Sequence, residues 1–195
     1  MRVMIAAVLG MALACGLGSG EALAADKHHR AKAAPPTGQR VSLLGGKWVF
    51  YLPKVYEKNP MPEIDEKARA AGVVGSLYLD KAAHRVVIVT ETPLPQGGQV
   101  SSNDSQTLDG ITGDVLKQQQ GSYGDFKKLG EKKMVRRGLG LRQLDIAGNV
   151  EGGRVISTTL SAASGTRTAM VNVISLEKDR KDHTARVTAI SNNKK

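Results

Sequence analysis

Two long segments rich in β-branched residues constrain the fold of this chain most strongly. They span residues 154–162 and 166–176, and a connection of three residues that includes Ser164-Gly165 joins them in the sequence. If the second segment is a strand, each of its two faces carries both apolar and polar side chains. A run with this composition is typical of a β-strand, and a connection this short favours antiparallel neighbours. The sequence therefore predicts that the C-terminal half is built around a β-meander.

Further strands are expected on both sides of this meander. Residues 47–52 are aromatic and β-branched and stop at Pro53. Residues 73–79 and 84–91 are two more candidates, separated by a four-residue connection that favours an antiparallel hairpin. The second of them carries apolar side chains on both faces, which indicates a central strand covered on both sides. Two additional strands are expected over residues 126–135 and from Leu139 onward.

Two helices are expected to cover the sheet. A helical stripe runs through residues 105–120, formed by Leu108, Ile111, Val115 and Leu116. The C-terminal segment places Thr184, Val187 and Ile190 at helical spacing. No repeat of 20 to 50 residues interrupts this pattern. The predicted class is α+β, with one mostly antiparallel sheet and helices packed on it.

The first residues have the pattern of an export signal. Arg2 is followed by an apolar stretch, and Ala22-Leu23-Ala24 offers small side chains at the two places that a signal peptidase requires. We predict a signal peptide over residues 1–24, a basic disordered linker over residues 25–40, and a single domain over residues 41–195. The expected location is the periplasm, because a cleaved signal peptide releases the chain after export.

Two alternatives concern this N-terminal region. Cys15 follows the small residue Ala14, as in bacterial lipoprotein signals, and lipidation there would anchor the domain to a membrane. Cleavage one residue later than Ala24 would begin the chain with Asp26, Lys27 and His28. An amine, two amides and an imidazole would then provide four nitrogens in a plane, a donor set that suits Cu(II) or Ni(II).

No enzyme site is apparent in the rest of the chain. His84 and His183 have no His, Cys or carboxylate at metal-ligand spacing, and we expect both histidines at the surface or at a sheet edge. No serine lies in a G-x-S-x-G motif, and Gly45-Gly46-Lys47 lacks the remaining residues of a phosphate-binding loop. The sequence therefore predicts a non-enzymatic protein with no cofactor.

The charge of the chain is its most unusual property. It contains 28 lysines and arginines against 18 aspartates and glutamates, which gives a net charge of +10. Six of the basic residues lie within eleven positions, in a segment expected to be a strand: Lys127, Lys128, Lys132, Lys133, Arg136 and Arg137. Such a ridge would attract an anionic envelope component or an envelope protein.

The same residues have a purely protective explanation as well. Lysines on an exposed edge strand oppose aggregation, and this alternative stays open at the level of the sequence. Nucleic acid is not an expected partner, because an exported protein rarely meets it and the ridge has no stacking aromatic besides Phe126. The chain is expected to be a monomer or a homodimer, and membrane contact is expected only with lipidation at Cys15.

A family resemblance adds to this interpretation. Three stretches carry it, together with the two β-rich segments after Gly153: residues 41–53 (VSLLGGKWVFYLP), residues 76–80 with 85–89 (SLYLD and RVVIV), and residues 141–145 (LRQLD). In order and spacing they resemble the DcrB-like proteins of the bacterial cell envelope, over roughly residues 41–190. The resemblance implies a PsbP-like sandwich, a twisted antiparallel sheet covered by helices. That family is tied to susceptibility to certain bacteriophages and has no agreed enzyme activity. Its members are often lipoproteins.

The expected function is therefore that of an exported, non-enzymatic binding or scaffold protein of the cell envelope, in contact with protein or anionic partners. The alternative is an N-terminal copper- or nickel-binding protein. The high positive charge is a departure from the family, so the resemblance does not identify the partner.

Overall fold

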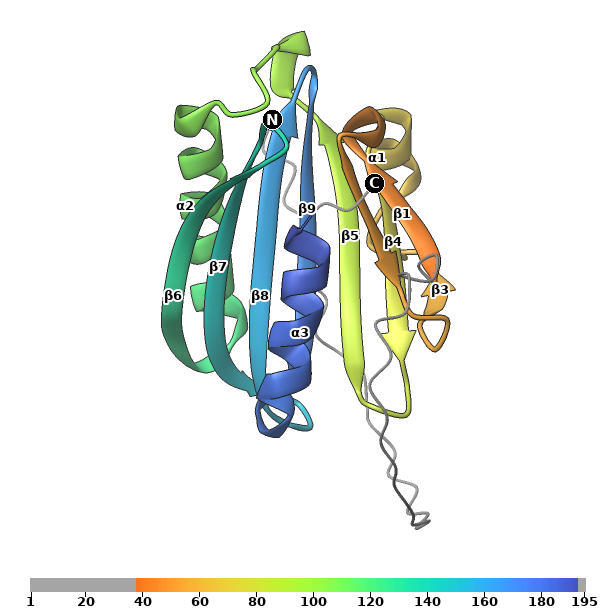
Figure 1. The fold of residues 1–195 in the computed structure, drawn as a ribbon, viewed down its shortest axis with the longest axis vertical. Helices are drawn as coiled ribbons and strands as arrows, with labels where there is room; N and C mark the ends of the chain where they lie inside the picture. Colours follow the sequence, from red (N-terminus) through yellow and green to blue (C-terminus); the bar gives the residue numbers. More distant parts are fainter. Residues whose placement is uncertain (1–37, 193–195) are drawn as a thin grey trace, which may run out of the picture.

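A seven-stranded sheet is the frame of the protein. The computed structural model describes residues 38–192. Every pairing within the sheet is antiparallel (Figure 1). From one edge to the other, the strands are β3 (Glu57–Asn59), β4 (Val74–Asp80), β5 (Arg85–Pro93), β9 (Arg167–Leu176), β8 (Gly153–Ser164), β7 (Leu139–Val150) and β6 (Gly124–Arg136). The α+β class and the C-terminal meander are thus confirmed.

The path of the chain explains why β6 lies at an edge. After β5, helix α2 (Ser105–Ser122) carries the chain to the far side of the sheet, where β6 begins. The meander then returns strand by strand until β9 pairs with β5. At the first of these turns, Arg137 and Gly138 have φ values of 53° and 77°. Two positive φ angles in a two-residue loop match the hairpin turn whose twist fits flanking strands.

The front face of the sheet is covered by a hairpin and the C-terminal helix. The hairpin consists of β1 (Gln39–Leu43) and β2 (Trp48–Leu52), and the helix is α3 (Arg180–Ser191). Their apolar side chains join those of the central strands in the largest core cluster, which includes Leu43, Trp48, Phe50, Val87, Leu141, Leu160, Val171, Val187 and Ile190.

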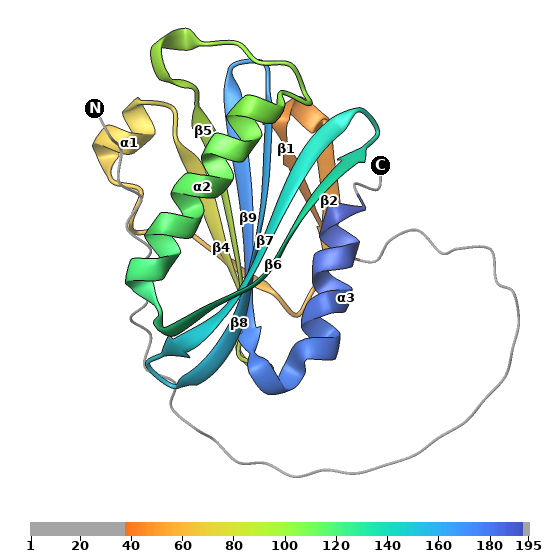
Figure 2. The same ribbon diagram turned by 90° about the vertical axis from the view of Figure 1, so that its left-hand side faces the viewer.

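The back face is covered by α2 and by the segment that contains α1 (Glu66–Ala70). Figure 2 shows α2 and α3 on opposite sides of the sheet. A second cluster lies between α2 and the strands, with Leu144, Ile146 and Tyr123 at its centre. A third cluster joins Met61, Ile64 and Val73 behind β4 and β5. In the described part of the chain, no helix has the length and apolarity that crossing a membrane requires.

Two differences from the sequence prediction concern short elements. The first strand, β1, begins at Gln39, two residues before the predicted start of the domain, and was not predicted as a strand. Edge strand β3 is not among the predicted strands either, because its three residues are polar and lie close to two prolines. The short helix α1 begins after its N-cap Asp65, which accepts from the amide of Ala68 at 2.7 Å.

The buried side of α2 is more polar than its apolar stripe predicted. Leu108 is fully buried as expected, whereas Ile111 is only half-buried. Thr112 and Gln119 are buried instead, since each has a hydrogen-bond partner: Thr112 Oγ1 donates to the Leu108 carbonyl at 2.9 Å and Gln119 Nε2 donates to Thr159 Oγ1 at 3.0 Å. The back face of β8 is rich in hydroxyl groups, so it can form hydrogen bonds with polar side chains of α2 such as Gln119.

Two leucine-sized residues of α2, Leu108 and Ile111, offer a direct test of this packing. We expect Leu108→Ala to lower the free energy of unfolding by about 2–4 kcal/mol, because Leu108 has no exposed surface. The matched change Ile111→Ala is expected to cost less than about 1 kcal/mol, because Ile111 already contacts solvent. Urea denaturation of the two variants measures the difference, and equal losses would contradict the orientation of α2.

Candidate functional site

The predicted basic ridge lies at the open edge of the large sheet. Five of its six residues are in β6, which pairs with β7 on one side and is the last strand of the sheet on the other. The sixth, Arg137, is in the turn that follows. All six side chains belong to exposed residues. The edge position that the sequence offered as an alternative is thus confirmed, and the ridge faces solvent.

Strand alternation divides the ridge between the two faces of the sheet. Lys133 is opposite Arg142 in the register, and its ammonium reaches Asp109 of α2, on the back face. The next residue, Met134, is opposite Leu141 and packs against the front core. A register irregularity between Lys128 and Gly130 then shifts the alternation along β6. The six cations therefore do not form one continuous surface.

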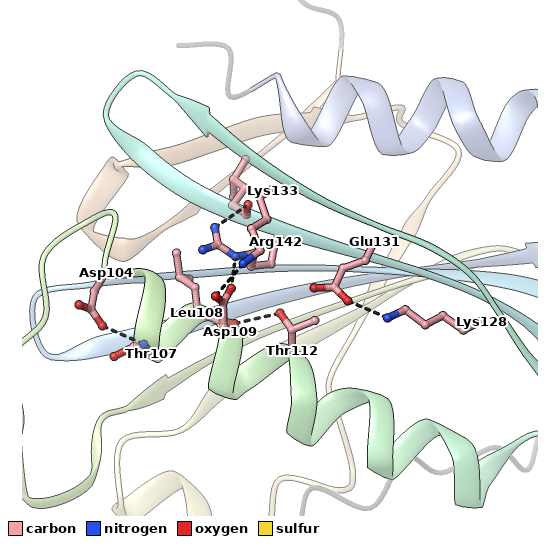
Figure 3. A network of polar contacts seen from close by, with 10 residues as sticks. Asp104, Thr107, Leu108, Asp109, Thr112, Lys128, Glu131, Lys133 and Arg142 are labelled. Atoms are coloured by element: carbon pink, nitrogen blue, oxygen red, sulfur yellow. Dashed lines mark hydrogen bonds and ion pairs between the residues drawn. The ribbon is translucent and has the colours of Figure 1, made fainter.

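The two lysines on the back face are neutralised by carboxylates. Lys128 Nζ lies 2.8 Å from Glu131 Oε2, and Lys133 Nζ lies 2.7 Å from Asp109 Oδ2. Asp109 also accepts from the buried Arg142, whose Nε is 2.6 Å from Asp109 Oδ1 (Figure 3). The hydrogen bonds from Lys133 and then Arg142 hold the pKa of Asp109 below its ordinary value. The ion pairs of Asp109 with Lys133 and Arg142 connect α2 to β6 and β7, whereas the Lys128–Glu131 pair lies within β6. Both back-face lysines are therefore paired within the structure.

The other four cations have no such partners. Lys127, Lys132 and Arg136 are opposite Ala147, Gln143 and Leu139, on the front face of the sheet, and Arg137 is at the tip of the hairpin. Within residues 38–192, none of the four forms an ion pair, and Arg136 donates only to the neighbouring Val135 carbonyl at 3.2 Å. We name these four residues the basic edge. They are the part of the ridge whose charge is available to a partner.

A buried histidine lies between α3 and the sheet, contrary to the prediction that both histidines are at the surface. His84 is exposed in a turn as expected, but His183 is only 5% exposed. The prediction for His183 was wrong. The helical stripe identified in the sequence consisted of Thr184, Val187 and Ile190, and it did not include His183. The residues that share the buried face of α3 are His183, Val187 and Ile190, at positions i, i+4 and i+7.

His183 belongs to a chain of polar contacts that reaches Asp145. Its Nε2 lies 2.9 Å from Thr158 Oγ1, and Thr158 in turn donates to Asp145 Oδ1 at 2.6 Å. Its Nδ1 lies 3.1 Å from Ser175 Oγ. The Thr158 hydroxyl donates its only hydrogen to Asp145, so its oxygen accepts from the Nε2–H group of His183. The Nδ1 atom of His183 then accepts from the Ser175 hydroxyl. Ser175 and Thr158 are both buried, so this chain positions α3 and offers no access to a substrate.

A groove of about 320 Å³ opens at the opposite end of the sheet. Along one side it is lined by the consecutive β1 residues Arg40, Val41, Ser42 and Leu43, and along the other by Lys58, Val74, Gly75, Ser76, Tyr78, Val89 and Glu91. Burial raises the pKa of the Tyr78 phenol above its ordinary value, which keeps the hydroxyl protonated. The groove is therefore lined by apolar side chains together with hydroxyl and charged groups.

The charges in the groove are unequally compensated. The carboxylate of Glu91 pairs with Arg167 and accepts from the Leu44 amide at 2.9 Å. Arg40 and Lys58 are exposed and have no ion-pair partner among the described residues. Sequence reasoning missed this groove, because β1 was not predicted as a strand and no motif marks the residues around it.

The remaining predicted site residues lie outside the described part of the chain. These are Cys15 of the lipidation alternative and Asp26, Lys27 and His28 of the copper or nickel alternative. Among residues 38–192, no group of three or more histidines, cysteines, aspartates or glutamates is arranged to hold a metal ion.

Comparison with known proteins supports the fold assignment. The structure is similar to the cyanobacterial PsbP protein CyanoP from Synechocystis sp. PCC 6803, with a TM-score of 0.57 and 10% identity over 85% of this chain and 96% of that chain. The PsbP-like fold that the family resemblance implied is therefore confirmed. No family model matches the chain, and no curated protein matches it in sequence.

Two further solved structures show a looser likeness. One is a Pseudomonas aeruginosa protein of unknown function, PA94, described as a putative regulator (TM-score 0.45, 11% identity, 82% of this chain and 97% of that chain). The other is LpqN of Mycobacterium tuberculosis, which is involved in cell envelope biogenesis (TM-score 0.47, 12% identity, 72% of this chain and 78% of that chain). At such identities, the likeness concerns the fold alone.

The burial of His183 predicts a specific dependence of stability on pH. Desolvation lowers the pKa of His183 from 6.5 to about 4, outweighing the opposing effect of Asp145; Arg180 and Arg85 lower it further. The folded state thus binds this proton less readily than the unfolded state, so stability is complete above pH 6.5 and is lost as the pH falls toward 4. The full loss from this group is about 3 kcal/mol.

Urea denaturation at pH 7 and at pH 4.5 measures this loss, with His183→Gln as the comparison. Glutamine retains a donor and an acceptor but does not titrate, so the variant should be less stable at pH 7 and should lose less stability on acidification. The same decrease in both proteins would show that His183 is not responsible.

Proposed function

We propose that this protein is an exported, non-enzymatic binding or scaffold protein of the bacterial cell envelope, of the DcrB-like kind, and that the basic edge contacts an anionic partner. The observation that carries the proposal is that only some of the basic residues of the ridge are paired with carboxylates. Lys128 and Lys133 are paired within the fold, whereas Lys127, Lys132, Arg136 and Arg137 have no carboxylate partners in the described structure. Unpaired cations on one edge attract anions over long range.

The position of the basic edge also favours a partner other than a second copy of the chain. Two β6 strands paired edge to edge would bring lysines and arginines close to one another, and like charges on neighbouring strands are destabilising. An anionic surface has the opposite effect, because it neutralises these charges without needing the backbone of β6. This argument supports a monomer that binds acidic lipid headgroups or acidic polymers of the envelope.

Binding to vesicles tests the proposal against the protective role of an edge lysine. We expect the chain to sediment with vesicles that contain phosphatidylglycerol and not with pure phosphatidylcholine vesicles, with affinity that falls steeply as sodium chloride is raised. Each basic residue near such a surface contributes about 1 kcal/mol. Replacing Lys127, Lys132, Arg136 and Arg137 by glutamine should therefore weaken binding by roughly a hundredfold or more.

A matched variant separates a site from net charge alone. Replacing the exposed Lys54, Lys117, Lys178 and Lys181 by glutamine removes the same total charge from other surfaces. This control should retain most of the affinity. Equal losses in the two variants would leave only a non-specific effect of charge, and unchanged binding by the first variant would exclude the basic edge as the contact.

The cellular location calls for a separate measurement. We expect an intact-mass spectrum of the protein purified from its own host to give a chain that begins at Ala25, because Ala22-Leu23-Ala24 satisfies the peptidase. A mass consistent with acylated Cys15 would make it a lipoprotein. A chain that begins at Asp26 would create the copper-binding terminus, and the unprocessed mass would contradict export by a cleaved signal peptide.

A further inference from the structure

The groove beside β1 has an open strand edge along its length. In residues 38–192, β1 pairs only with β2, and the two form a sheet of their own. Along a strand, alternate residues direct their amide and carbonyl groups to opposite sides, so half of these groups in β1 are not used by β2. Four consecutive residues of β1 line the groove, Arg40 through Leu43. The unused backbone groups therefore border the groove.

The floor of the groove is a part of the large sheet that the front layer leaves uncovered. The groove contacts Val74, Ser76 and Tyr78, which alternate along β4 on its front face, and Lys58 of the adjoining β3. Val74 is 54% exposed, although its neighbours on the same face, Tyr78 and Val89, are buried in the core. Figure 1 shows β1 as the outermost strand of the front layer on this side. One more strand beside β1 would complete that layer.

The charges at the groove select the kind of strand that fits. Arg40 and Lys58 are unpaired among the described residues, while Glu91 is already neutralised by Arg167 and the Leu44 amide. An incoming segment with carboxylates is thus attracted. The chain's own residues 25–37 are a poor occupant, because they contain Lys27, Arg30 and Lys32 and a single acid. A second copy of β1 is disfavoured for the same reason, since it would bring another Arg40.

We propose that this groove binds an extended acidic segment of a partner polypeptide, which adds to β1 as a third strand and places its carboxylates near Arg40 and Lys58. The backbone groups of β1 would supply the hydrogen bonds, and alternate side chains of the segment would rest on Val74 and Tyr78. This inference goes beyond the proposed function, because it concerns β1 and β4 at the end of the sheet opposite to the basic edge.

Titration of the isotope-labelled protein with a synthetic peptide tests the inference by NMR. The probe is a blocked pentapeptide of sequence Glu-Val-Thr-Val-Glu. We expect amide shifts in residues 39–43 and 74–78, with little change in β6. Two control peptides should bind much more weakly: one with lysine in place of both glutamates, and one with methylated backbone nitrogens, which cannot donate to β1.

Protein variants examine the role of charge. The double change Arg40→Gln and Lys58→Gln should weaken binding of the acidic peptide by at least about fivefold. The matched double change Lys117→Gln and Lys178→Gln, at exposed positions away from the groove, should leave it unchanged. Because these residues are exposed, the variants should fold, and none of them alters the basic edge that vesicle binding tests.

Several outcomes would overturn the inference. One is the absence of shifts at millimolar peptide, and another is shifts confined to β6. Equal binding of the methylated peptide would exclude strand addition. Equal binding of glutarate, a small dicarboxylate, would show that the groove takes small anions and not a polypeptide segment. None of these results would alter the vesicle experiment, so the two proposals fail separately.

Discussion

The structure depends on the packing of the front layer against the central strands. Trp48 is the only tryptophan of the chain and has no exposed surface. It stands 6.0 Å from Phe50, measured between ring centroids, and its Nε1 donates to the Ile190 carbonyl at 3.1 Å. One side chain thereby connects the hairpin at the start of the domain to the helix at its end, across 142 positions of sequence. A buried indole needs a partner for its N–H, and the last turn of α3 offers unused carbonyls.

This arrangement covers the middle of the sheet and leaves its two ends different from each other. At one end, β6 is long and exposed, and it carries lysines on both faces, of which those on the back are paired with carboxylates. At the other end, the front layer stops at β1, so the faces of β4 and β3 contribute to a groove. The charge of β6 opposes the addition of a strand from another copy, whereas β1 has apolar floor residues beside its open edge. The two partners that we propose, an anionic surface and an extended segment, would therefore use different ends of the sheet.

The strand pattern was largely predictable, because most strands of the sheet are long and β-branched. The strands β4, β5, β6, β8 and β9 follow the expected segments closely, and α2 and α3 occur where helical spacing was found. The short elements were not predictable in the same way. Three polar residues are sufficient for β3 because they pair with β4, and β1 is a strand because β2 is beside it. Hydrophobic periodicity does not report pairing of this kind.

The α+β class, the meander, the excess of positive charge and the segment in which six basic residues gather all follow from the amino-acid sequence alone. Which of these charges are available to a partner depends instead on the tertiary structure. Asp109 and Arg142 reach the ridge from α2 and β7, and a register irregularity in β6 changes the alternation of its side chains. The burial of His183 and the groove beside β1 also depend on the tertiary structure. The physical reason is that local pattern selects the type of each element, whereas charge compensation and burial depend on contacts between residues far apart in the chain.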